Sequence, residues 1–570
     1  MPLKNLFANF FAALLFLNIS IEACAQQSDP GDFISLLNSA RQYTTDQKWK
    51  EAVDVWEQVV ERNPVNGEYI ANLAFVYYNA AQYAKSIEAY KKQLELGWGI
   101  LHNAAYNIAC CYSLGGDKEN ALHWLQRAFD MGFRSYTRAQ QDTDFNNIKT
   151  DTRFKKIVAL EDVSKMSRTE GWRYDMDILK REVMRKAYLR RELSLDAFNK
   201  EYQDIYNTID KKTDVQMIMA LMKLMVTVND GHSNVFPPSR KEFQQSVPLQ
   251  FYFFKEGLYV IASDEKNKHL LGAKVLGFEK KSVDEVVKKL SPILARDNEM
   301  GVLHNLAGLV RYPLALHGAG LISHQSVIEL QLMDSTGKKF TAKVESDMTT
   351  PRVDHKSIPA NWTTLYQMNG KPIPLYLKNP KTYYWFEQMP NTKTVYLQWN
   401  AVVNDKSESL RQFTDRLFKY INDNDVDKLI IDLRWNNGGN TMLVPHFINS
   451  VIRSDKINKR GNLYVITGRR TFSAAQNLST YLEQRTNSIF VGEPTGSNPN
   501  FVGEEDFITL PYSKLAMNVS DLFWQSSWPG DHRTWIAPTI YTPPTFKAYN
   551  ANKDESLEAV LKLTAEKKAF

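Results

Sequence analysis

Cysteine is scarce in this chain, which has only three among 570 residues: Cys24, Cys110 and Cys111. Cys110 and Cys111 are adjacent within a helical pattern, and neighbouring helical side chains point in different directions and rarely form a disulfide bridge. A disulfide framework is therefore excluded, and both residues are expected to be small core residues. No cluster of histidine, cysteine and carboxylate has the spacing of metal ligands, so neither a metal ion nor an organic cofactor is expected.

A strong excess of charge of one sign is also missing. The formal net charge is +6, from 70 basic and 64 acidic residues, and the two signs alternate along the chain. There is no stripe of basic residues with interleaved aromatic residues, so nucleic-acid binding is not expected. The composition is ordinary for globular protein, and the length corresponds to about three to five domains.

Long hydrophobic runs are absent after the N-terminal segment. In that segment Lys4 precedes the almost wholly apolar residues 6–17, and the small-x-small site Ala23-Cys24-Ala25 follows. This three-part pattern is typical of a secretory signal peptide, predicted at residues 1–25. The apolar part is too short for a permanent membrane-spanning helix. The mature chain is therefore expected to be exported to the periplasm or the extracellular space, with no transmembrane segment.

Two alternatives to a cleaved signal peptide stay open. Ile21-Glu22-Ala23-Cys24 loosely resembles a lipoprotein box, although the glutamate is out of character there. Lipidation of Cys24 would attach the exported protein to a membrane. The other alternative is a short membrane anchor.

Residues 30–145 contain an internal repeat. Each unit has a small residue, an aromatic residue three positions later and a second small residue twelve positions after the first, as in Ala40-Tyr43-Ala52, Ala74-Tyr77-Ser86 and Ala109-Tyr112-Ala121. Small residues let paired helices approach closely, and the pattern resembles the tetratricopeptide repeat, whose period is about 34 residues. The resemblance implies an α-helical array with a concave surface for a protein partner or a peptide. A helical spacer without a ligand is the alternative.

Two periodicities divide the next part of the chain. Residues 165–240 are predicted to be helical, because apolar residues recur at spacings of three and four until the turn Asn229-Asp230-Gly231-His232-Ser233. Residues 245–347 then contain five strand-like segments and one helix at 282–294, which predicts a small β domain. This domain is similar to a PDZ domain, a fold that binds a peptide as an added strand, although no carboxylate-binding loop is recognisable.

Strands and helices alternate in residues 360–570, the predicted catalytic domain. Buried hydrophobic strands are expected at 394–400, 428–435, 463–468 and 488–493, with helices between them. The whole chain is therefore predicted to be a multidomain α+β protein.

Ser473 opens a helix directly after one of these buried strands. There its hydroxyl can point into a cleft, and the first N–H groups and the dipole of the helix can stabilise an oxyanion. Taken alone, however, Ser473 and Gln476 are more simply an S-x-x-Q capping box.

Gly438 and Gly439 end the neighbouring strand, where the lack of a Cβ lets the backbone approach a ligand. The alternative is an ordinary glycine turn. Asp432 and Arg434 at the same strand end are expected to hold this glycine loop. His232 lies in a turn and not on an apolar face, so it is not expected to be a buried structural histidine. It could serve as the base that a serine nucleophile needs, although a single histidine in a turn more often has no catalytic role.

In combination, these segments resemble the tail-specific (C-terminal-processing) serine peptidases. Asp-Leu-Arg-Trp-Asn-Asn-Gly-Gly-Asn at 432–440, Thr-Phe-Ser-Ala-Ala-Gln at 471–476 and Gly-Glu-Pro-Thr-Gly at 492–496 occur in the family's order. The turn at 229–233 resembles the histidine motif of the tricorn-like and retinoid-binding-protein-like branch. The resemblance covers about residues 171–570 and implies a C-terminal ββα core similar to ClpP and crotonase.

The resemblance implies a role for each matching residue. Ser473 would attack the scissile carbonyl, and His232 would be the general base and then the general acid. Gly438 or Gly439, together with Ala474, would donate backbone N–H groups to the oxyanion, each worth roughly 3–4 kcal/mol in other enzymes.

The chain departs from the better-known branch of the family, which uses a lysine about 25 residues after the serine. Residues 496–500 contain no lysine, which favours His232 as the base. The histidine branch adds an acidic residue late in the chain. Asp531 is the candidate that would orient His232, and Glu493 is the second, although Asp531 could equally form a surface ion pair with His532 or Arg533.

The predicted function is therefore an exported serine-type peptidase that hydrolyses polypeptide substrates, with the repeats binding a partner or the substrate. A catalytically inactive peptidase fold that acts as a periplasmic binding or scaffold module is the alternative that the missing lysine suggests. An esterase that uses the same serine and histidine is a third interpretation. A pocket lined by Trp399, Phe472 or Trp524 would accept an apolar side chain.

Overall fold

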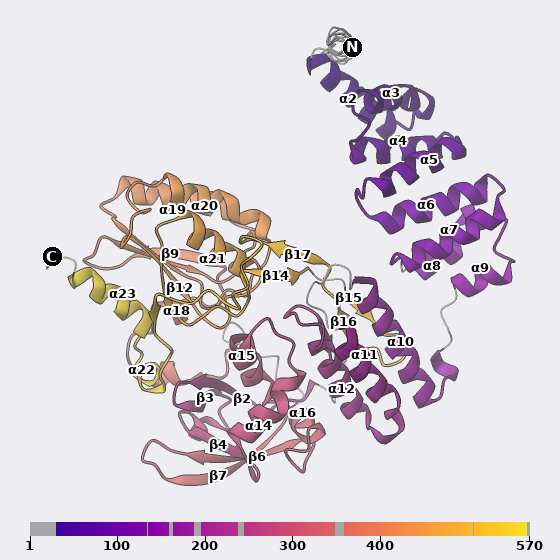
Figure 1. Cartoon of the computed structure of the whole chain (residues 1–570). Helices are drawn as coiled ribbons and strands as arrows, with labels where there is room; N and C mark the ends of the chain where they lie inside the picture. Colours follow the sequence, from indigo (N-terminus) through magenta and orange to yellow (C-terminus); the bar gives the residue numbers. More distant parts are fainter. Residues whose placement is uncertain are drawn as a thin grey trace, which may run out of the picture. The chain divides into compact units, whose positions relative to one another are not determined.

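The computed structural model of the chain describes residues 30–133, 135–158, 163–186, 195–237, 244–347, 358–504 and 507–566. The predicted signal peptide and Cys24 lie outside these residues. The chain divides into two compact units, residues 1–162 and 163–570 (Figure 1). The predicted helical segment, β domain and catalytic domain all belong to the second unit. Within the described ranges, no helix is both long enough and apolar enough to cross a membrane.

The first unit is helical throughout its described part. Its α-helices are α2 (Pro30–Thr45), α3 (Trp49–Arg62), α4 (Gly67–Asn79), α5 (Tyr83–Glu95), α6 (Leu101–Leu114), α7 (Lys118–Asp130), α8 (Tyr136–Gln141) and α9 (Thr152–Ile157). The small residues of the repeat, such as Ala52, Ala74 and Ala109, are fully buried where neighbouring helices meet. The Ser86 hydroxyl donates to the Ala74 carbonyl at 2.8 Å, which joins two helices directly. The identity of the array as tetratricopeptide repeats stays a prediction.

The second unit begins with three helices, α10 (Arg168–Lys186), α11 (Leu195–Tyr206) and α12 (Asp214–Val226). Their apolar sides share one core with residues from the far end of the sequence, among them Leu510 and Met517. Strand β1 (Asn234–Phe236) pairs antiparallel with β16 (Ala516–Asn518), which in turn pairs with β15 (Phe507–Thr509). The histidine turn between α12 and β1 is thereby attached to the C-terminal part of the chain.

The β domain is an antiparallel sheet in the order β2-β3-β4-β6-β7. Its strands are β2 (Leu249–Phe254), β3 (Gly257–Ser263), β4 (Lys274–Phe278), β6 (Val327–Met333) and β7 (Lys339–Glu345), with the short strands β5 (Lys281–Ser282) and β8 (Thr363–Thr364) beside them. Helix α14 (Val283–Leu290) occupies the predicted helical segment.

The sequence predicted a single helix in this domain, and that prediction is wrong. The structure adds α15 (Glu299–Leu309) and α16 (Pro313–Gly318). The sequence of α15 contains Gly301 and Gly308 and has apolar residues on several sides, so it lacks the regular polar face that identifies a surface helix. Its buried residues, such as Leu306, complete the core of the β domain.

The C-terminal part of the chain is built on a six-stranded sheet in the order β18-β13-β12-β11-β10-β9. The strands are β9 (Tyr384–Gln388), β10 (Thr394–Trp399), β11 (Lys428–Asp432), β12 (Leu463–Thr467), β13 (Ile489–Gly492) and β18 (Ile540–Tyr541). Only β9 and β10 pair antiparallel, and the other neighbours are parallel. The strand-helix alternation read from the sequence therefore gives a mostly parallel sheet.

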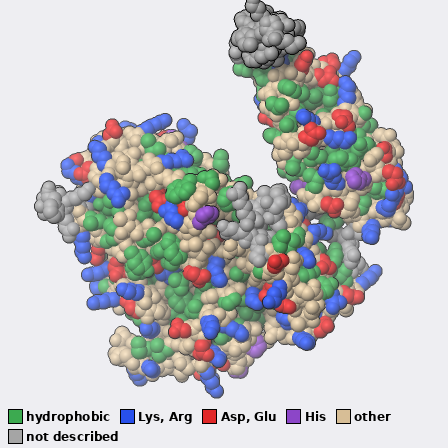
Figure 2. Space-filling model, in the orientation of Figure 1, with side chains coloured by type: hydrophobic (Ala, Val, Ile, Leu, Met, Phe, Trp, Pro, Cys, Tyr) green, Lys and Arg blue, Asp and Glu red, His purple; other side chains and the backbone are tan. Residues whose placement is uncertain are grey.

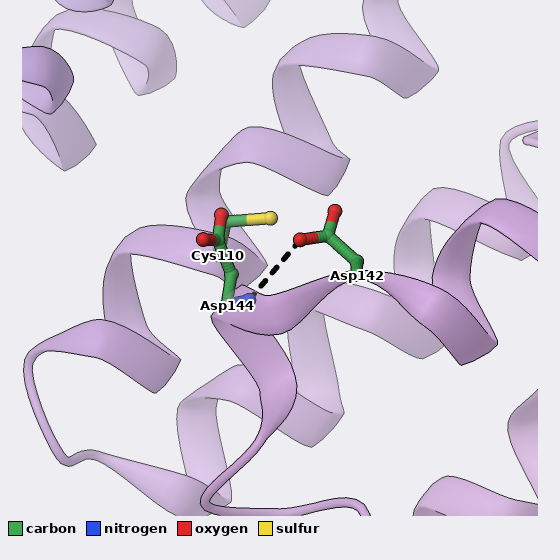
Figure 3. Close-up of side chains that lie close together, drawn as sticks. All are labelled: Cys110, Asp142 and Asp144. Atoms are coloured by element: carbon green, nitrogen blue, oxygen red, sulfur yellow. Dashed lines mark hydrogen bonds between the residues drawn. The ribbon is translucent and has the colours of Figure 1, made fainter.

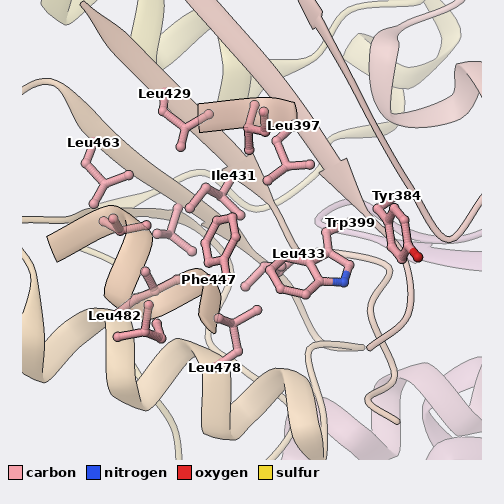
Figure 4. Packing of buried hydrophobic residues seen from close by; sticks show 14 of the residues in the cluster. Tyr384, Leu397, Trp399, Leu429, Ile431, Leu433, Phe447, Leu463, Leu478 and Leu482 are labelled. Carbon is pink, nitrogen blue, oxygen red and sulfur yellow. The ribbon is translucent and has the colours of Figure 1, made fainter. Parts of the chain in front are cut away.

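Helices cover both faces of this sheet. Alternate strand residues such as Leu397 and Ile431 pack against α19 (Leu410–Asp423), α20 (Val444–Arg453) and α21 (Ala474–Arg485) (Figure 4). The intervening residues, such as Tyr396 and Ile430, face α23 (Glu555–Glu566). Trp399 is fully buried on the first face, with its ring centroid 4.9 Å from that of Phe447. The sequence suggested that Trp399 lines a substrate pocket. This suggestion is wrong, because its position on β10 places it in the core.

The remaining elements are short. Strand β14 (Asn500–Gly503) pairs with β17 (Leu522–Gln525) in a two-stranded sheet, and Trp524 lies on β17. Helices α17 (Leu365–Met368), α18 (Leu375–Lys378) and α22 (Phe546–Asn550) lie near the junction with the β domain. On the face shown in Figure 2, basic and acidic side chains are interspersed, in keeping with their alternation along the sequence.

Candidate active site

Ser473 stands at the turn between β12 and α21. Its backbone φ is 53° and its ψ is −125°, in a region that residues other than glycine rarely adopt. The turn is held from both sides: the Thr471 N–H donates to the Gly468 carbonyl at 2.8 Å, and the Thr471 hydroxyl donates to the Leu433 carbonyl at 2.9 Å. Strain of this kind, about 1–3 kcal/mol, persists only where the surroundings impose it, and it concentrates at functional sites.

The Ser473 side chain makes no capping hydrogen bond to α21. Gln476, the other half of the predicted capping box, donates instead to the Thr480 hydroxyl at 3.3 Å. The capping interpretation is wrong because a capping serine needs an extended backbone, which the positive φ of Ser473 excludes. The hydroxyl is thus left for another partner.

The glycine loop after β11 lies directly against this serine. A Cβ at Gly438 would be 2.7 Å from the Ser473 Cβ and 2.9 Å from the Ala474 nitrogen. Gly438 has a φ of 102° and Gly439 a φ of 137°, and a Cβ at Gly439 would be 2.2 Å from the Val402 carbonyl oxygen. Both positions therefore require glycine, for its positive φ and for the close approach of the backbone.

The two glycines differ in what their N–H groups can do. The Gly438 N–H already donates to the Asn436 side-chain oxygen at 2.9 Å. The N–H groups of Gly439 and Ala474 have no acceptor among the residues that the structure describes. Of the two glycines that the sequence left open, Gly439 therefore has an N–H available to a ligand, as Ala474 does, and Gly438 does not.

The His232 ring lies between two phenylalanine rings beside this turn. Its centroid is 4.4 Å from that of Phe472, which precedes Ser473, and 5.3 Å from that of Phe501 on β14. Both rings are stacked on the imidazole, whose two nitrogens have no hydrogen-bond partner within the described part of the chain. The structure thus brings His232 and Ser473 into one locality without a hydrogen bond between them.

Burial controls the charge of this histidine. His232 is buried, and the loss of hydration lowers the pKa of its imidazole to about 4, although the nearby Asp230 carboxylate opposes the shift. The expectation that a histidine in a turn would not be buried is therefore wrong, because β1 and β14 enclose the turn. At neutral pH the ring is uncharged and can accept a proton.

Neither predicted acidic partner is bonded to the imidazole. The Asp531 carboxylate accepts from the Ser527 hydroxyl at 2.6 Å and from Arg533 Nε at 2.9 Å, and these contacts lower its pKa to about 2. Glu493 forms a buried ion pair with Arg469, whose Nε is 3.1 Å from Oε2. The ion pair between Asp531 and Arg533, which the sequence analysis gave as the alternative role of Asp531, is therefore present.

Arg434 ties the base of the glycine loop to the C-terminal part of the chain. Its guanidinium donates to both carboxylate oxygens of Asp554, at 3.0 and 2.9 Å, and lies 2.8 Å from Asp432. All three groups are largely buried. A cavity of about 100 Å³ beside Arg434 is lined by aromatic residues such as Tyr252, Tyr376 and Trp435, but not by Ser473 or His232.

We expect Arg434→Met to lower the free energy of unfolding by about 3–5 kcal/mol, because it leaves two carboxylates buried without their cation. Urea unfolding followed by circular dichroism measures this change. The matched control is Arg416→Met. Arg416 also binds a carboxylate with two nitrogens, at 2.7 and 2.8 Å from Glu408, but it is exposed, so its loss should cost less than about 1 kcal/mol. Equal effects would show that the Arg434 network is not a structural anchor.

A group with potential metal-ligand atoms lies in the first unit (Figure 3). Cys110 Sγ and carboxylate oxygens of Asp142 and Asp144 lie within 4.8 Å of one another. One oxygen of each carboxylate already accepts a hydrogen bond, since Tyr106 donates to Asp142 at 2.7 Å and Tyr78 donates to Asp144 at 2.5 Å. Burial and the two carboxylates raise the pKa of the Cys110 thiol well above its usual value. The group is therefore a hydrogen-bonded core contact of a protonated thiol.

Sequence reasoning missed the residues that surround the imidazole. Asp230 accepts the His232 N–H at 2.8 Å and also the Ser233 N–H, and an aspartate two residues before a turn position could have indicated this. Phe472 and Phe501 carry no such signal, because their stacking on His232 depends on three distant segments meeting.

No family model and no curated protein sequence matches the chain. Among solved structures, the chain is similar to CPAF in complex with lactacystin, with 10% identity, 69% of this chain and 98% of that chain covered, and a TM-score of 0.46. It is also similar to the photosystem II D1 C-terminal processing protease, with 12% identity, coverage of 70% and 97%, and a TM-score of 0.34.

A third similar structure is a Bacteroides fragilis protein described as an S41 protease, with 13% identity, coverage of 60% and 87%, and a TM-score of 0.29. The second and third structures are peptidases of the kind that the sequence motifs resemble. All three TM-scores are below 0.5, so the function proposed below depends on the geometry of the site.

Proposed function

We propose that this chain is a serine-type peptidase that hydrolyses peptide bonds of polypeptide substrates, with Ser473 as the nucleophile. The observation that carries the proposal is the strained, uncapped Ser473, with the glycine loop against it and the His232 ring stacked on the preceding residue. A serine that only capped the N-terminus of a helix would need none of these features. Strain and close backbone approach are what a serine aimed at a substrate carbonyl requires.

The reaction follows from these positions. Ser473 Oγ forms a bond to the scissile carbonyl carbon, and the carbonyl electron pair moves to the oxygen. The N–H groups of Gly439 and Ala474 stabilise that oxyanion. His232 takes the hydroxyl proton and returns it to the leaving amine, and water then hydrolyses the acyl-enzyme.

The contact between His232 and Ser473 must form on the way to this reaction. Catalytic hydrogen bonds are often long or absent without substrate and tighten when it binds. The ring of His232 is held by Phe472 and Phe501, whereas Asp531 is held by Arg533. For Asp531 to orient the imidazole, its carboxylate would first have to leave Arg533. The aromatic stack is therefore the stronger candidate for the group that orients the ring.

The test uses the chain from Gln26 onward and a fluorophosphonate probe. In the labelling step the Ser473 Oγ–phosphorus bond forms, the phosphorus–fluorine bond breaks, fluoride leaves and the proton passes to His232. Mass spectrometry should locate the label on Ser473. The untreated protein should create new termini in an unfolded-protein digest, and the labelled protein should not.

The outcomes of this test separate the three interpretations. Label on another residue, or digestion that survives labelling, would overturn the assignment. No label and no cleavage, with the protein folded, would favour the inactive binding module. Labelling without peptide cleavage would favour an esterase, which a panel of ester substrates would then identify.

The pH dependence gives a separate prediction. Because the pKa of His232 is lowered to about 4, the imidazole stays neutral to low pH. The rate of labelling should be level between about pH 6 and 8 and should fall only below about pH 5. Rates measured from pH 3.5 to 8, with circular dichroism as the control for folding, test this. A midpoint near the ordinary value of 6.5 would mean that the reacting imidazole is hydrated and outside the aromatic stack.

Export and partner binding extend the proposal beyond the site. The signal-like segment at residues 1–25 supports export to the periplasm or the extracellular space, with cleavage before Gln26, or with lipid attachment at Cys24 as the alternative. The helical repeats at 30–145 would bind a polypeptide, either a partner or the substrate. Fractionation of cells that express the chain, with its N-terminus read by mass spectrometry, tests the export. Cytoplasmic protein with an intact N-terminus would contradict it.

A further inference from the structure

The backbone of the histidine turn is held by two carboxylates. The N–H groups of His232 and Ser233 donate to Asp230, within the turn itself. The preceding N–H, that of Gly231, donates to Asp297 Oδ1 at 2.6 Å. Three consecutive N–H groups are thus fixed, and one of their acceptors comes from a distant part of the chain.

Asp297 reaches this turn from the β domain. It lies in the segment between a short 3₁₀-helix (Ser291–Ile293) and α15, both of which contribute to the core of that domain. A Cβ at Gly231 would be 3.1 Å from the Asp297 backbone nitrogen and 3.0 Å from the Phe472 ring. The absence of a side chain at Gly231 therefore permits this approach.

Asp297 and the next residue, Asn298, also bind two other loops near the site, one after β13 and one before β18. The Ser497 hydroxyl donates to Asp297 Oδ2. The Asn298 side chain donates to the Thr495 carbonyl at 3.1 Å and to the Thr534 carbonyl at 2.6 Å. Asp297 and Asn298 therefore join the histidine turn to the loops after β13 and before β18.

Among the described residues, no basic side chain forms an ion pair with Asp297. Asp230 faces it from the histidine turn, and together with burial it raises the pKa of Asp297 to about 7. Arg296, on the same segment, lies 3.4 Å from Glu299. In the two loops, Glu493 is paired with Arg469, and Asp531 with Arg533. A buried carboxylate is costly, and the Ser497 hydroxyl and the N–H groups of Gly231 and Asn498 offset that cost, so the bond to the histidine turn is part of what keeps Asp297 in place.

We propose that Asp297 is a positioning residue for His232: by accepting the Gly231 N–H, it fixes the turn that presents the imidazole to Ser473. The inference rests on the proposed function of His232. Because no side chain in the described part of the chain binds either ring nitrogen, the backbone turn, the two stacked rings and the adjacent Val502 backbone determine where the imidazole lies. Asp297 makes the position of this turn depend on the β domain.

Two measurements on the chain from Gln26 onward test this inference. Hydrogen exchange read by mass spectrometry follows the peptide that contains residues 229–237 and does not depend on activity. Fluorophosphonate labelling at increasing reagent concentration separates reagent binding from the bond-forming rate. The variants are Asp297→Ala, which removes the acceptor, and Asp297→Asn, which keeps an oxygen for Gly231. Asp284→Ala is the control, because Asp284 is an exposed aspartate in the same domain.

Asp297→Ala should exchange about tenfold or more faster in this peptide and label about 10–100-fold more slowly in the bond-forming step, with reagent binding unchanged. Asp297→Asn should stay within about threefold of the unmodified protein in both measurements, and so should Asp284→Ala. Unchanged exchange in Asp297→Ala would overturn the inference, and so would an Asn variant that is as impaired as the Ala variant.

The two proposals can fail separately. If Asp297→Ala loosens the turn but the unmodified protein does not label, Asp297 positions the turn and the proposed peptidase function fails. If labelling occurs at equal rates in all variants, the peptidase function survives and the positioning role fails. Should Asp297→Ala not fold, Ser497→Ala removes the other side-chain hydrogen bond that holds the Asp297 carboxylate, and unchanged exchange of the 229–237 peptide in that variant would overturn the inference.

Discussion

Ser473→Ala is expected to reduce hydrolysis by at least about 10⁴-fold while the protein stays folded, because it removes the only atom that forms the bond to the substrate. Its stability should change little, since alanine keeps the strained φ of 53°. Ser473→Gly should be equally inactive but more stable than the alanine variant by about 1 kcal/mol, because glycine adopts this conformation without strain. Cleavage rates and urea unfolding measure the two effects.

The control for this prediction is another serine of the same helix. Ser479 is fully buried in α21, and its hydroxyl donates to the Ala475 carbonyl at 2.8 Å. Ser479→Ala should lower stability slightly and keep hydrolysis within a few-fold. Activity that persists in Ser473→Ala would rule out Ser473 as the nucleophile. A glycine variant no more stable than the alanine variant would show that the turn is not strained.

Gly438→Ala should have the second-largest effect, on both stability and catalysis. The new Cβ would overlap the Ser473 Cβ at 2.7 Å and the Ala474 nitrogen at 2.9 Å, at a φ of 102°. These are backbone and near-backbone atoms that cannot rotate away. We expect a loss of about 2–4 kcal/mol in the free energy of unfolding. Displacing the oxyanion loop should also reduce hydrolysis by at least about 100-fold.

Gly320→Ala separates steric overlap from backbone strain. Gly320 also has a positive φ, of 70°, but a Cβ there would meet no atom within 4 Å. Its replacement should cost about 1–2 kcal/mol and leave hydrolysis unchanged. If Gly438→Ala and Gly320→Ala proved equal in both measurements, the loop would not lie against the serine as described.

Local sequence was sufficient for the features that depend on neighbours in the chain. Buried apolar runs predicted the strands β10 to β13, because a strand that is covered on both faces consists mostly of apolar residues. Repeated small residues predicted where helices of the first unit approach, since only small side chains fit there. The turn at Ser473 and the glycine pair after β11 were likewise visible, because each lies within a few residues of a recognisable strand end.

The same local reasoning failed where the answer depended on tertiary contacts. It favoured a helix cap at Ser473, since the four-residue pattern carries no information on φ. It did not expect His232 to be buried, because Phe472 and Phe501, which stack on its ring, come from other parts of the sequence. It missed α15, because the apolar residues of this helix are buried in the core of the β domain and not on one regular face.

By itself, then, the sequence determined which residues could take part in chemistry: Ser473, the glycines after β11 and His232. Only the tertiary structure decided their relations. The pairing of β1 with β16 carries the histidine turn to the far end of the chain, and the sheet order sets β11 beside β12 so that Gly438 meets Ser473. Contacts of this kind join segments tens to hundreds of residues apart. No spacing along the chain encodes which N–H is left free, which ring stacks on His232, or that Asp297 holds its turn.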